Sequence, residues 1–329
     1  MAHHSHIVDL REMGNCDPVA NPVAWAFSSA VFWLVQNVYG GVRVEIEDFP
    51  ELSSPVLFAM NHSHYFDFMQ SRRAMFKQEG VLTTSFVKLR ALQNRLEGAY
   101  IKSMGNIPTI SRGYVISADF AQLHQRKLDE AEYRILRDHI NMGAPLPELP
   151  LYKALQETPR DMLGLGFDPG SMTYRDGIGA CYSEAMATTI ALANEVTAAG
   201  HSLHIYPEGL VSSRLSRGRI GTVQFALALD LPIVPVGFSG MNECFPRMKM
   251  VPKKRGVLAM RFGEPYRIDR SRFQDFTPFS PEDEVRFQDP LKDETAQLMN
   301  RISALLDDEC SGGEDHVGDG FKGVARFFE

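Results

Sequence analysis

The sequence has few cysteines, and they are not spaced as a metal or disulfide scaffold requires. The four cysteines, Cys16, Cys181, Cys244 and Cys310, are far apart and form no Cys-x-x-Cys pair. A zinc ribbon needs such pairs, and a small secreted domain needs a dense cysteine framework. The pattern argues against both classes and favours a protein of a reducing compartment such as the cytosol.

An excess of positive charge is also absent. The chain has 34 Lys and Arg residues against 41 Asp and Glu residues, which gives a formal net charge of −7. It has no lysine-rich tail to displace counterions from nucleic acid, so we expect no nucleic-acid partner. The sequence also lacks a Gly-x-Ser-x-Gly motif and a P-loop, and therefore fits neither a nucleophile-elbow hydrolase nor an NTPase.

The N-terminal region lacks two further features. Residues 1–14 have no basic segment followed at once by an apolar run, which a cleaved secretory signal needs, so we expect no export. Between Asp17 and Arg43 the chain carries no charge at all, and both of its tryptophans, Trp25 and Trp33, lie in this stretch. This is the most membrane-like part of the sequence.

Local signals in the charge-free stretch predict a helix. Asn21 can cap its start, Pro22 suits its first turn, and Gly40 can close it. About 18 residues at about 1.5 Å each give roughly 27 Å, just short of a bilayer core. We predict an interfacial helix that lies on a membrane surface. The alternative is a buried helix that covers the core of a soluble domain.

The composition is that of a large folded chain with appended segments. It has 329 residues, of which 44% are hydrophobic and 23% charged, and single cores stop growing near roughly 250–300 residues. We expect an N-terminal segment over residues 1–41, a main domain over 42–275, and a C-terminal helix and tail over 276–329.

The main domain alternates strand and helix patterns, which predicts an α/β fold. Short apolar runs bounded by turn residues are typical of buried strands. A Pro- and Gly-rich region over residues 143–179 predicts a long irregular excursion or lid. Strands are expected at 56–60, 85–88, 105–110, 203–206 and 233–236, and helices at 67–76, 117–139, 183–199 and 294–306.

The segment Asn61–Asp67 follows an apolar strand and precedes a helix, which is where chemistry gathers in an α/β sheet. Ligands collect outside the carboxyl ends of such strands. His62 can act there as a general base if the carboxylate of Asp67 holds its other ring nitrogen. The pattern predicts a histidine–aspartate pair.

The spacing of this pair is weak by itself. His4 with Asp9 and His124 with Asp129 have the same spacing, but only His62 has a strand behind it and a helix ahead. A structural histidine that caps the helix start is the alternative reading.

Metal binding by the histidines of this segment is a further reading that we do not favour. His62 and His64 could share a metal, but the cysteine and carboxylate ligands of a closed site are not evident. We therefore expect no metal site.

Two further segments have features of site-building loops. Tyr206-Pro207-Glu208-Gly209 ends a strand with a proline that cannot extend the ladder and a glycine that permits close backbone approach. Gly105–Pro108 leads to Arg112, whose planar guanidinium suits a phosphate.

In this order, and with Leu231–Val236 as a fourth block, these segments resemble the glycerolipid acyltransferases, the lysophosphatidic acid acyltransferase family. The resemblance runs from about residue 42 to about residue 269. It implies a core with a mixed sheet flanked by helices. It also implies acyl transfer, without a resident cofactor, from acyl-CoA or acyl carrier protein as co-substrate to a hydroxyl of a lysophospholipid acceptor.

The resemblance also assigns roles to residues. It implies that His62 deprotonates the acceptor hydroxyl and that Asp67 orients the histidine. Lys88 is a looser match to a family lysine. The residues that the resemblance places at the acceptor are Asn61, Lys88, Arg112, Glu208 and Gly209.

The sequence departs from the family pattern in two places. After Gly209 the family continues Thr-Arg-Ser, whereas here the run is Leu-Val-Ser-Ser-Arg, so that Arg214, Arg217 or Arg219 has to replace the usual arginine. The segment of about 113–183 is longer than the family usually has, and we expect it to be an insertion of the main domain.

The sequence as a whole predicts an O-acyltransferase at the cytoplasmic face of a membrane, acting on 1-acylglycerol 3-phosphate with His62 as base and Arg214 among the acceptor contacts. The alternatives are another acceptor, namely glycerol 3-phosphate, another lysophospholipid or an aminolipid, or a thioester hydrolase that uses water. A non-catalytic lipid-binding module is the third class.

Overall fold

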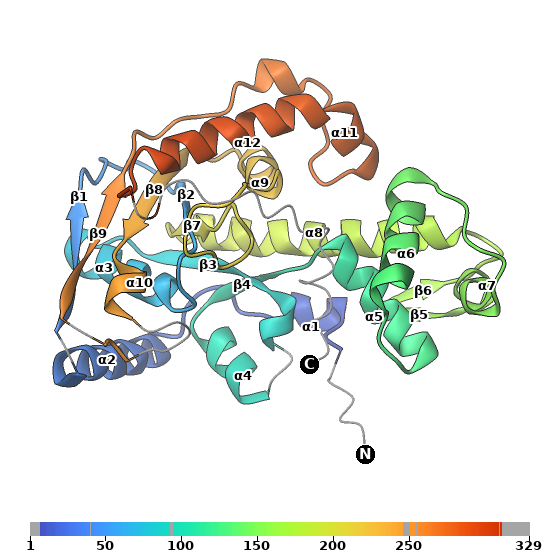
Figure 1. Cartoon of the computed structure of the whole chain (residues 1–329), viewed down its shortest axis with the longest axis horizontal. Coiled ribbons are helices and arrows are strands. Elements are labelled where there is room, and N and C mark those ends of the chain that lie inside the picture. Colours follow the sequence, from blue (N-terminus) through green and yellow to red (C-terminus); the bar gives the residue numbers. More distant parts are fainter. Residues whose placement is uncertain are drawn as a thin grey trace.

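A seven-stranded sheet forms the centre of the molecule (Figure 1). The computed structural model describes residues 7–39, 41–92, 95–245, 251–253, 255–308 and 310. The strands of the central sheet are β1 (Val42–Glu47), β2 (Leu57–Met60), β3 (Thr83–Lys88), β4 (Asn106–Thr109), β7 (Ser202–Ile205), β8 (Ile233–Ser239) and β9 (Gly256–Phe262).

The sheet is mixed, as the family resemblance implies, and its strand order is β1-β9-β8-β2-β7-β3-β4. The five strands β8, β2, β7, β3 and β4 are mutually parallel, whereas β9 runs antiparallel to β8 and β1 runs parallel to β9. The carboxyl ends of five neighbouring strands therefore meet at one edge of the sheet, which is the edge where α/β proteins bind ligands.

Helices cover both faces of the sheet (Figure 1). The helices are α1 (Leu10–Gly14), α2 (Pro22–Tyr39), α3 (Asp67–Glu79), α4 (Arg95–Ser103), α5 (Arg112–His124), α6 (Glu130–Met142), α7 (Pro150–Glu157), α8 (Tyr174–Ala198), α9 (Gly221–Leu229), α10 (Met241–Cys244), α11 (Pro281–Arg286) and α12 (Gln288–Ser303). In Figure 1, α8, α9 and α12 lie on one side of the sheet, and α2, α3 and α10 lie on the other.

Alternation along the strands separates two cores. Leu57 and Ala59 of β2 pack into the core beneath α8, α9 and α12, whereas Phe58 and Met60 pack into the core on the α3 side. Successive side chains of a strand point to opposite faces, so the same rule places His204 of β7 on the α3 side, opposite Leu203 and Ile205. The face of the sheet on which a side chain lies therefore decides whether it can reach the start of α3.

The predicted insertion contains more regular structure than the sequence suggests. The predicted helix over 117–139 is two helices, α5 and α6, separated by a left-handed residue at Gln125. The prediction of an irregular excursion over 143–179 is wrong, because this region holds α7, a hairpin and the first turns of α8. The hairpin consists of β5 (Arg160–Met162) and β6 (Leu165–Phe167).

Glycines near its N-terminus make α8 look shorter in the sequence than it is: the predicted helix begins at residue 183, whereas α8 begins at Tyr174. A capping box of Thr173 and Asp176 begins the helix at Tyr174. Gly177 looks like a helix breaker in the sequence, but it is a packing position, because a Cβ there would lie 2.9 Å from the Phe167 ring.

The helix of the charge-free stretch, α2, forms as predicted, with Pro22 at its first position and the side chain of Asn21 accepting hydrogen bonds from the Val23 and Ala24 amides. Trp25 packs edge-on against Phe76 of α3. None of the described helices is long and apolar enough to cross a bilayer. Most of the predicted tail after α12 lies outside the described residues.

Candidate active site

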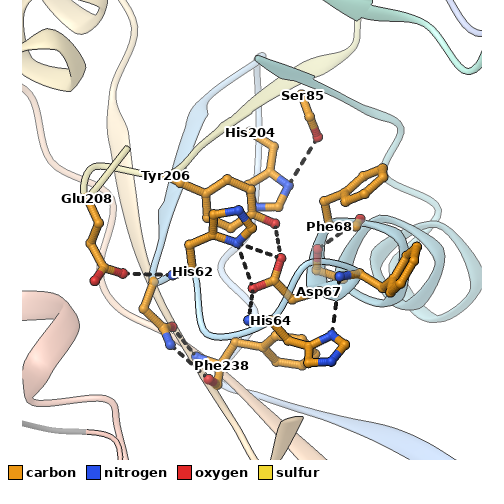
Figure 2. Close-up of polar contacts among 12 residues, drawn as sticks. His62, His64, Asp67, Phe68, Ser85, His204, Tyr206, Glu208 and Phe238 are labelled. Carbon is orange, nitrogen blue, oxygen red and sulfur yellow. Dashed lines mark hydrogen bonds and ion pairs between the residues drawn. The ribbon is translucent and has the colours of Figure 1, made fainter. Parts of the chain in front are cut away.

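His62 and Asp67 form a direct pair where β2 gives way to α3 (Figure 2). The Nδ1 atom of His62 lies 3.0 Å from each carboxylate oxygen of Asp67. Asp67 is fully buried, whereas the His62 side chain is 18% exposed. Because Nδ1 faces a carboxylate, the neutral ring carries its proton on Nδ1, and Nε2 keeps a lone pair for a proton from substrate.

Two other donors hold the Asp67 carboxylate. The His64 amide donates to one oxygen at 3.1 Å and the Tyr206 hydroxyl donates to the other at 2.7 Å. A buried carboxylate is costly unless it is hydrogen-bonded, and these donors together with His62 satisfy both oxygens. The protein itself therefore holds the carboxylate of Asp67 beside the imidazole.

Tyr206 reaches both members of the pair. Its ring stacks on the His62 ring with centroids 4.0 Å apart and an angle of 18° between the planes. It follows β7, the neighbour of β2, and lies two residues after His204 on the α3 side of the sheet. The sequence motif identifies Tyr206 only as the end of a strand. Its position two residues after His204 places it on the same face of the sheet, and this spacing is the signal that could have identified it.

Glu208 supports the His62 loop from within the protein. One carboxylate oxygen accepts from the His62 amide at 2.8 Å, and the other accepts from the amide and hydroxyl of Ser216 at 2.7 and 2.6 Å. The side chain is only 1% exposed, and burial raises its pKa. Both oxygens of Glu208 thus hold the backbone of the site, and its expected acceptor contact stays a prediction.

Asn61 joins two strands of the sheet. Its side-chain oxygen accepts from the Phe238 amide at 2.8 Å, and its side-chain nitrogen donates to the Phe238 carbonyl at 3.0 Å. The side chain is buried. Both ends of the amide join the end of β2 to β8, and the expected acceptor contact of Asn61 stays a prediction.

Arg112 and Lys88 lie on the same edge of the sheet but farther from His62. Strands are about 4.8 Å apart, so Lys88 at the end of β3 is roughly 10 Å along the edge from β2, and Arg112 after β4 is roughly 14 Å away. Arg112 pairs with Glu284 of α11, donates to Asn141 at 3.1 Å and stacks over Tyr182. These groups orient the guanidinium, and the expected contact of Arg112 with the acceptor phosphate stays a prediction.

The turn after Glu208 brings an arginine to its backbone. Gly209 has a positive φ of 63°, where a side chain would be strained. Arg219 donates from Nε to the Glu208 carbonyl at 3.2 Å, and its amide donates to the Pro207 carbonyl. Arg214 and Arg217 are exposed on the same loop. Arg219, one of the three arginines expected to replace the family residue, therefore contacts this turn directly.

Two buried basic side chains lie beneath the pair, on the α3 side. His204 is fully buried and contacts Ser85 at 3.5 Å, and burial lowers its pKa to about 3, so it stays neutral. Arg72 is buried with hydrogen bonds to Asn106 and the Met104 carbonyl, and burial lowers its pKa to about 10. Arg72 therefore keeps its charge at neutral pH, and no sequence motif singles it out.

The described part of the chain contains no group of three or more His, Cys, Asp or Glu side chains placed to hold a metal ion. His64 turns away from His62, and its Nδ1 accepts from the Phe66 amide at 3.3 Å.

Comparisons with known proteins give limited similarity. No family model matches the sequence, and no curated protein matches it. Among solved structures, the chain is similar to the 1-acyl-sn-glycerophosphate (LPA) acyltransferase PlsC from Thermotoga maritima, with a TM-score of 0.39 and 12% sequence identity over 85% of this chain and 79% of that chain. The chemistry of the site is therefore inferred from its own residues.

Proposed function

We propose that the protein is an O-acyltransferase that moves a fatty acyl group from acyl-CoA or acyl carrier protein to the free hydroxyl of a 1-acylglycerol 3-phosphate. The observation that carries the proposal is the His62–Asp67 pair at the carboxyl edge of the sheet, with Nδ1 on the carboxylate and Nε2 available as a base. The order of the four sequence blocks that resemble glycerolipid acyltransferases supports the choice of reaction.

The pair is suited to activating an alcohol. An alcohol is a weak nucleophile at neutral pH, and a positioned base contributes typically about 10²–10⁴-fold to such a step. Nε2 of His62 takes the hydroxyl proton as the oxygen attacks the thioester carbonyl. Asp67 stabilises the imidazolium that forms.

Collapse of the tetrahedral intermediate completes the transfer. The carbon–sulfur bond breaks, the ester of the acceptor is released, and the leaving thiolate takes the proton from the His62 imidazolium. The base is thereby regenerated, and no covalent acyl-enzyme is formed. His62 alone carries the proton in both directions, while Asp67 and Tyr206 remain fixed.

Product analysis tests the proposed reaction. Purified protein is incubated with palmitoyl-CoA, and in a parallel arm with palmitoyl-acyl carrier protein, and offered lysophosphatidic acid, glycerol 3-phosphate or lysophosphatidylcholine. We expect phosphatidic acid from lysophosphatidic acid, detected by mass spectrometry. An ester of another acceptor would revise the substrate, free palmitate alone would favour a hydrolase, and no product from either donor would contradict the proposal.

We also propose that α2 rests on a membrane surface. Its most exposed described side chains are apolar: Val23 is 78% exposed, Phe27 68%, Leu34 55% and Trp33 54%. No acidic or basic residue is present in the helix. Burial of a large apolar side chain is worth roughly 1.5–3 kcal/mol, so several on one helix bind a lipid interface strongly.

A vesicle assay checks this surface. The double variant Phe27→Ser with Leu34→Ser is expected to bind vesicles of phosphatidylcholine and phosphatidylglycerol at least about tenfold more weakly than the wild type, since two buried side chains are lost. The matched control, Met142→Ser with Val285→Ser, removes two side chains that are each 70% exposed on other helices. Equal sedimentation of both double variants with the vesicles would show that another surface binds them.

A further inference from the structure

Tyr206 joins two loops that come from distant parts of the chain. The loop after β2 supplies His62 and Asp67, and the strand β7 ends immediately before Tyr206. The Tyr206 hydroxyl is 2.7 Å from Asp67 Oδ1, and its ring lies parallel to the His62 ring. Figure 2 shows the three side chains in contact, with the tyrosine between the histidine and the body of the sheet.

We propose that Tyr206 is a positioning residue of the histidine–aspartate pair: its ring fixes the plane of the His62 imidazole, and its hydroxyl fixes the Asp67 carboxylate. This inference rests on the proposed function, in which His62 is the base. The roles belong to different atoms of one side chain and can therefore be separated by substitution.

The hydroxyl fixes how Asp67 faces His62. The carboxylate accepts hydrogen bonds from three donors, namely the Tyr206 hydroxyl, the His64 amide and His62 Nδ1. Without the hydroxyl, one oxygen of the carboxylate loses a donor, and the carboxylate is free to turn away from the imidazole. Loss of the hydroxyl is therefore expected to weaken the hydrogen bond between Asp67 and His62 Nδ1, and with it the stabilisation of the imidazolium.

The ionisable neighbours do not compete with this effect over the working pH range. Burial and the nearby Asp67 raise the pKa of Tyr206 well above its usual value, so its hydroxyl stays a donor. His204, on the same strand, stays neutral because burial lowers its pKa. Arg72 of α3 stays charged. Glu208, in the turn after β7, is buried with a raised pKa, and it contacts the backbone rather than the ring of His62.

The test uses the full-length variant Tyr206→Phe, which keeps the ring and removes the hydroxyl. We expect kcat for acyl transfer to fall about tenfold with little change in KM, since the hydroxyl is bonded to Asp67 and acts through the pair. We expect the Nδ1–H proton of His62 to lose part of the downfield shift that a hydrogen bond to a carboxylate produces. This proton is followed by NMR of protein labelled with ¹⁵N-histidine, and the His62 signal is assigned by its loss in His62→Gln.

A matched control separates this role from general packing. The Tyr114 hydroxyl donates to the Val8 carbonyl in another part of the core, so Tyr114→Phe removes a buried tyrosine hydroxyl without touching the pair. We expect Tyr114→Phe to leave the His62 Nδ1–H signal and kcat as in the wild type. Tyr206→Leu, which also removes the stacked ring, is expected to lower kcat further than Tyr206→Phe.

The readouts distinguish this inference from the proposed function. If the wild type transfers acyl groups, an unchanged kcat or an unchanged His62 Nδ1–H signal in Tyr206→Phe overturns the positioning role. If the wild type transfers none, the proposed function fails, and the Nδ1–H signal alone decides whether Tyr206 acts on the pair, because it needs no substrate.

Discussion

Replacing His62 with alanine is expected to reduce the kcat of acyl transfer by at least about 10²–10⁴-fold, because the acceptor hydroxyl loses its base. The loss is expected in kcat rather than KM, since the imidazole acts mainly in the transition state. Added imidazole is expected to restore part of the activity by entering the space that the side chain leaves. The rate is measured as free CoA thiol released with lysophosphatidic acid present.

His124 offers a control with the same spacing to an aspartate. Asp129 lies five residues after it, but its carboxylate caps α6 by accepting from the Glu132 amide. His124→Ala is therefore expected to keep normal turnover. Near-normal activity of His62→Ala in a folded protein, confirmed by its thermal unfolding, would exclude His62 as the base.

Asp67→Asn is expected to lower kcat by a similar factor of about 10²–10⁴, because the amide cannot stabilise an imidazolium as a carboxylate does. The change also places an NH₂ group among three donors, the His62 ring, the His64 amide and the Tyr206 hydroxyl. At least one donor then faces another donor, and the His62 ring is favoured in the wrong tautomer.

The matched control for this change is Asp129→Asn. Asparagine caps a helix about as well as aspartate, so this variant is expected to keep both fold and activity. Activity and melting temperature are measured together for the two variants. Wild-type kcat in Asp67→Asn would contradict the role of the carboxylate and leave His62 acting alone.

The proximity of His62 and Asp67 was predictable because both residues lie within one short segment of the sequence. An apolar strand followed by a loop and a helix start places both residues at the edge of the sheet, and the structure has them within hydrogen-bond distance. The helix of the charge-free segment was predictable for the same reason, since its cap and its composition lie within one stretch of sequence.

The partners of the other predicted site residues were not predictable from local pattern. Arg112 pairs with Glu284, which is 172 residues away, and Asn61 bonds to Phe238, which is 177 residues away. Motif position places a side chain at an edge, but tertiary packing decides whether it faces ligand or protein. Tyr206 was underestimated for the same reason, because its role depends on which strand lies beside β2.

The position of β7 between β2 and β3 has a consequence for folding. β7 lies between β2 and β3 but is synthesised more than a hundred residues after them. The Tyr206–Asp67 contact spans 139 residues, and the Glu208–His62 contact spans 146. A nascent chain that ends before β7 holds the base and its aspartate without the side chains that fix them. Contacts of such long sequence separation form slowly, so the site is completed only when β7 has been made and enters the sheet between β2 and β3.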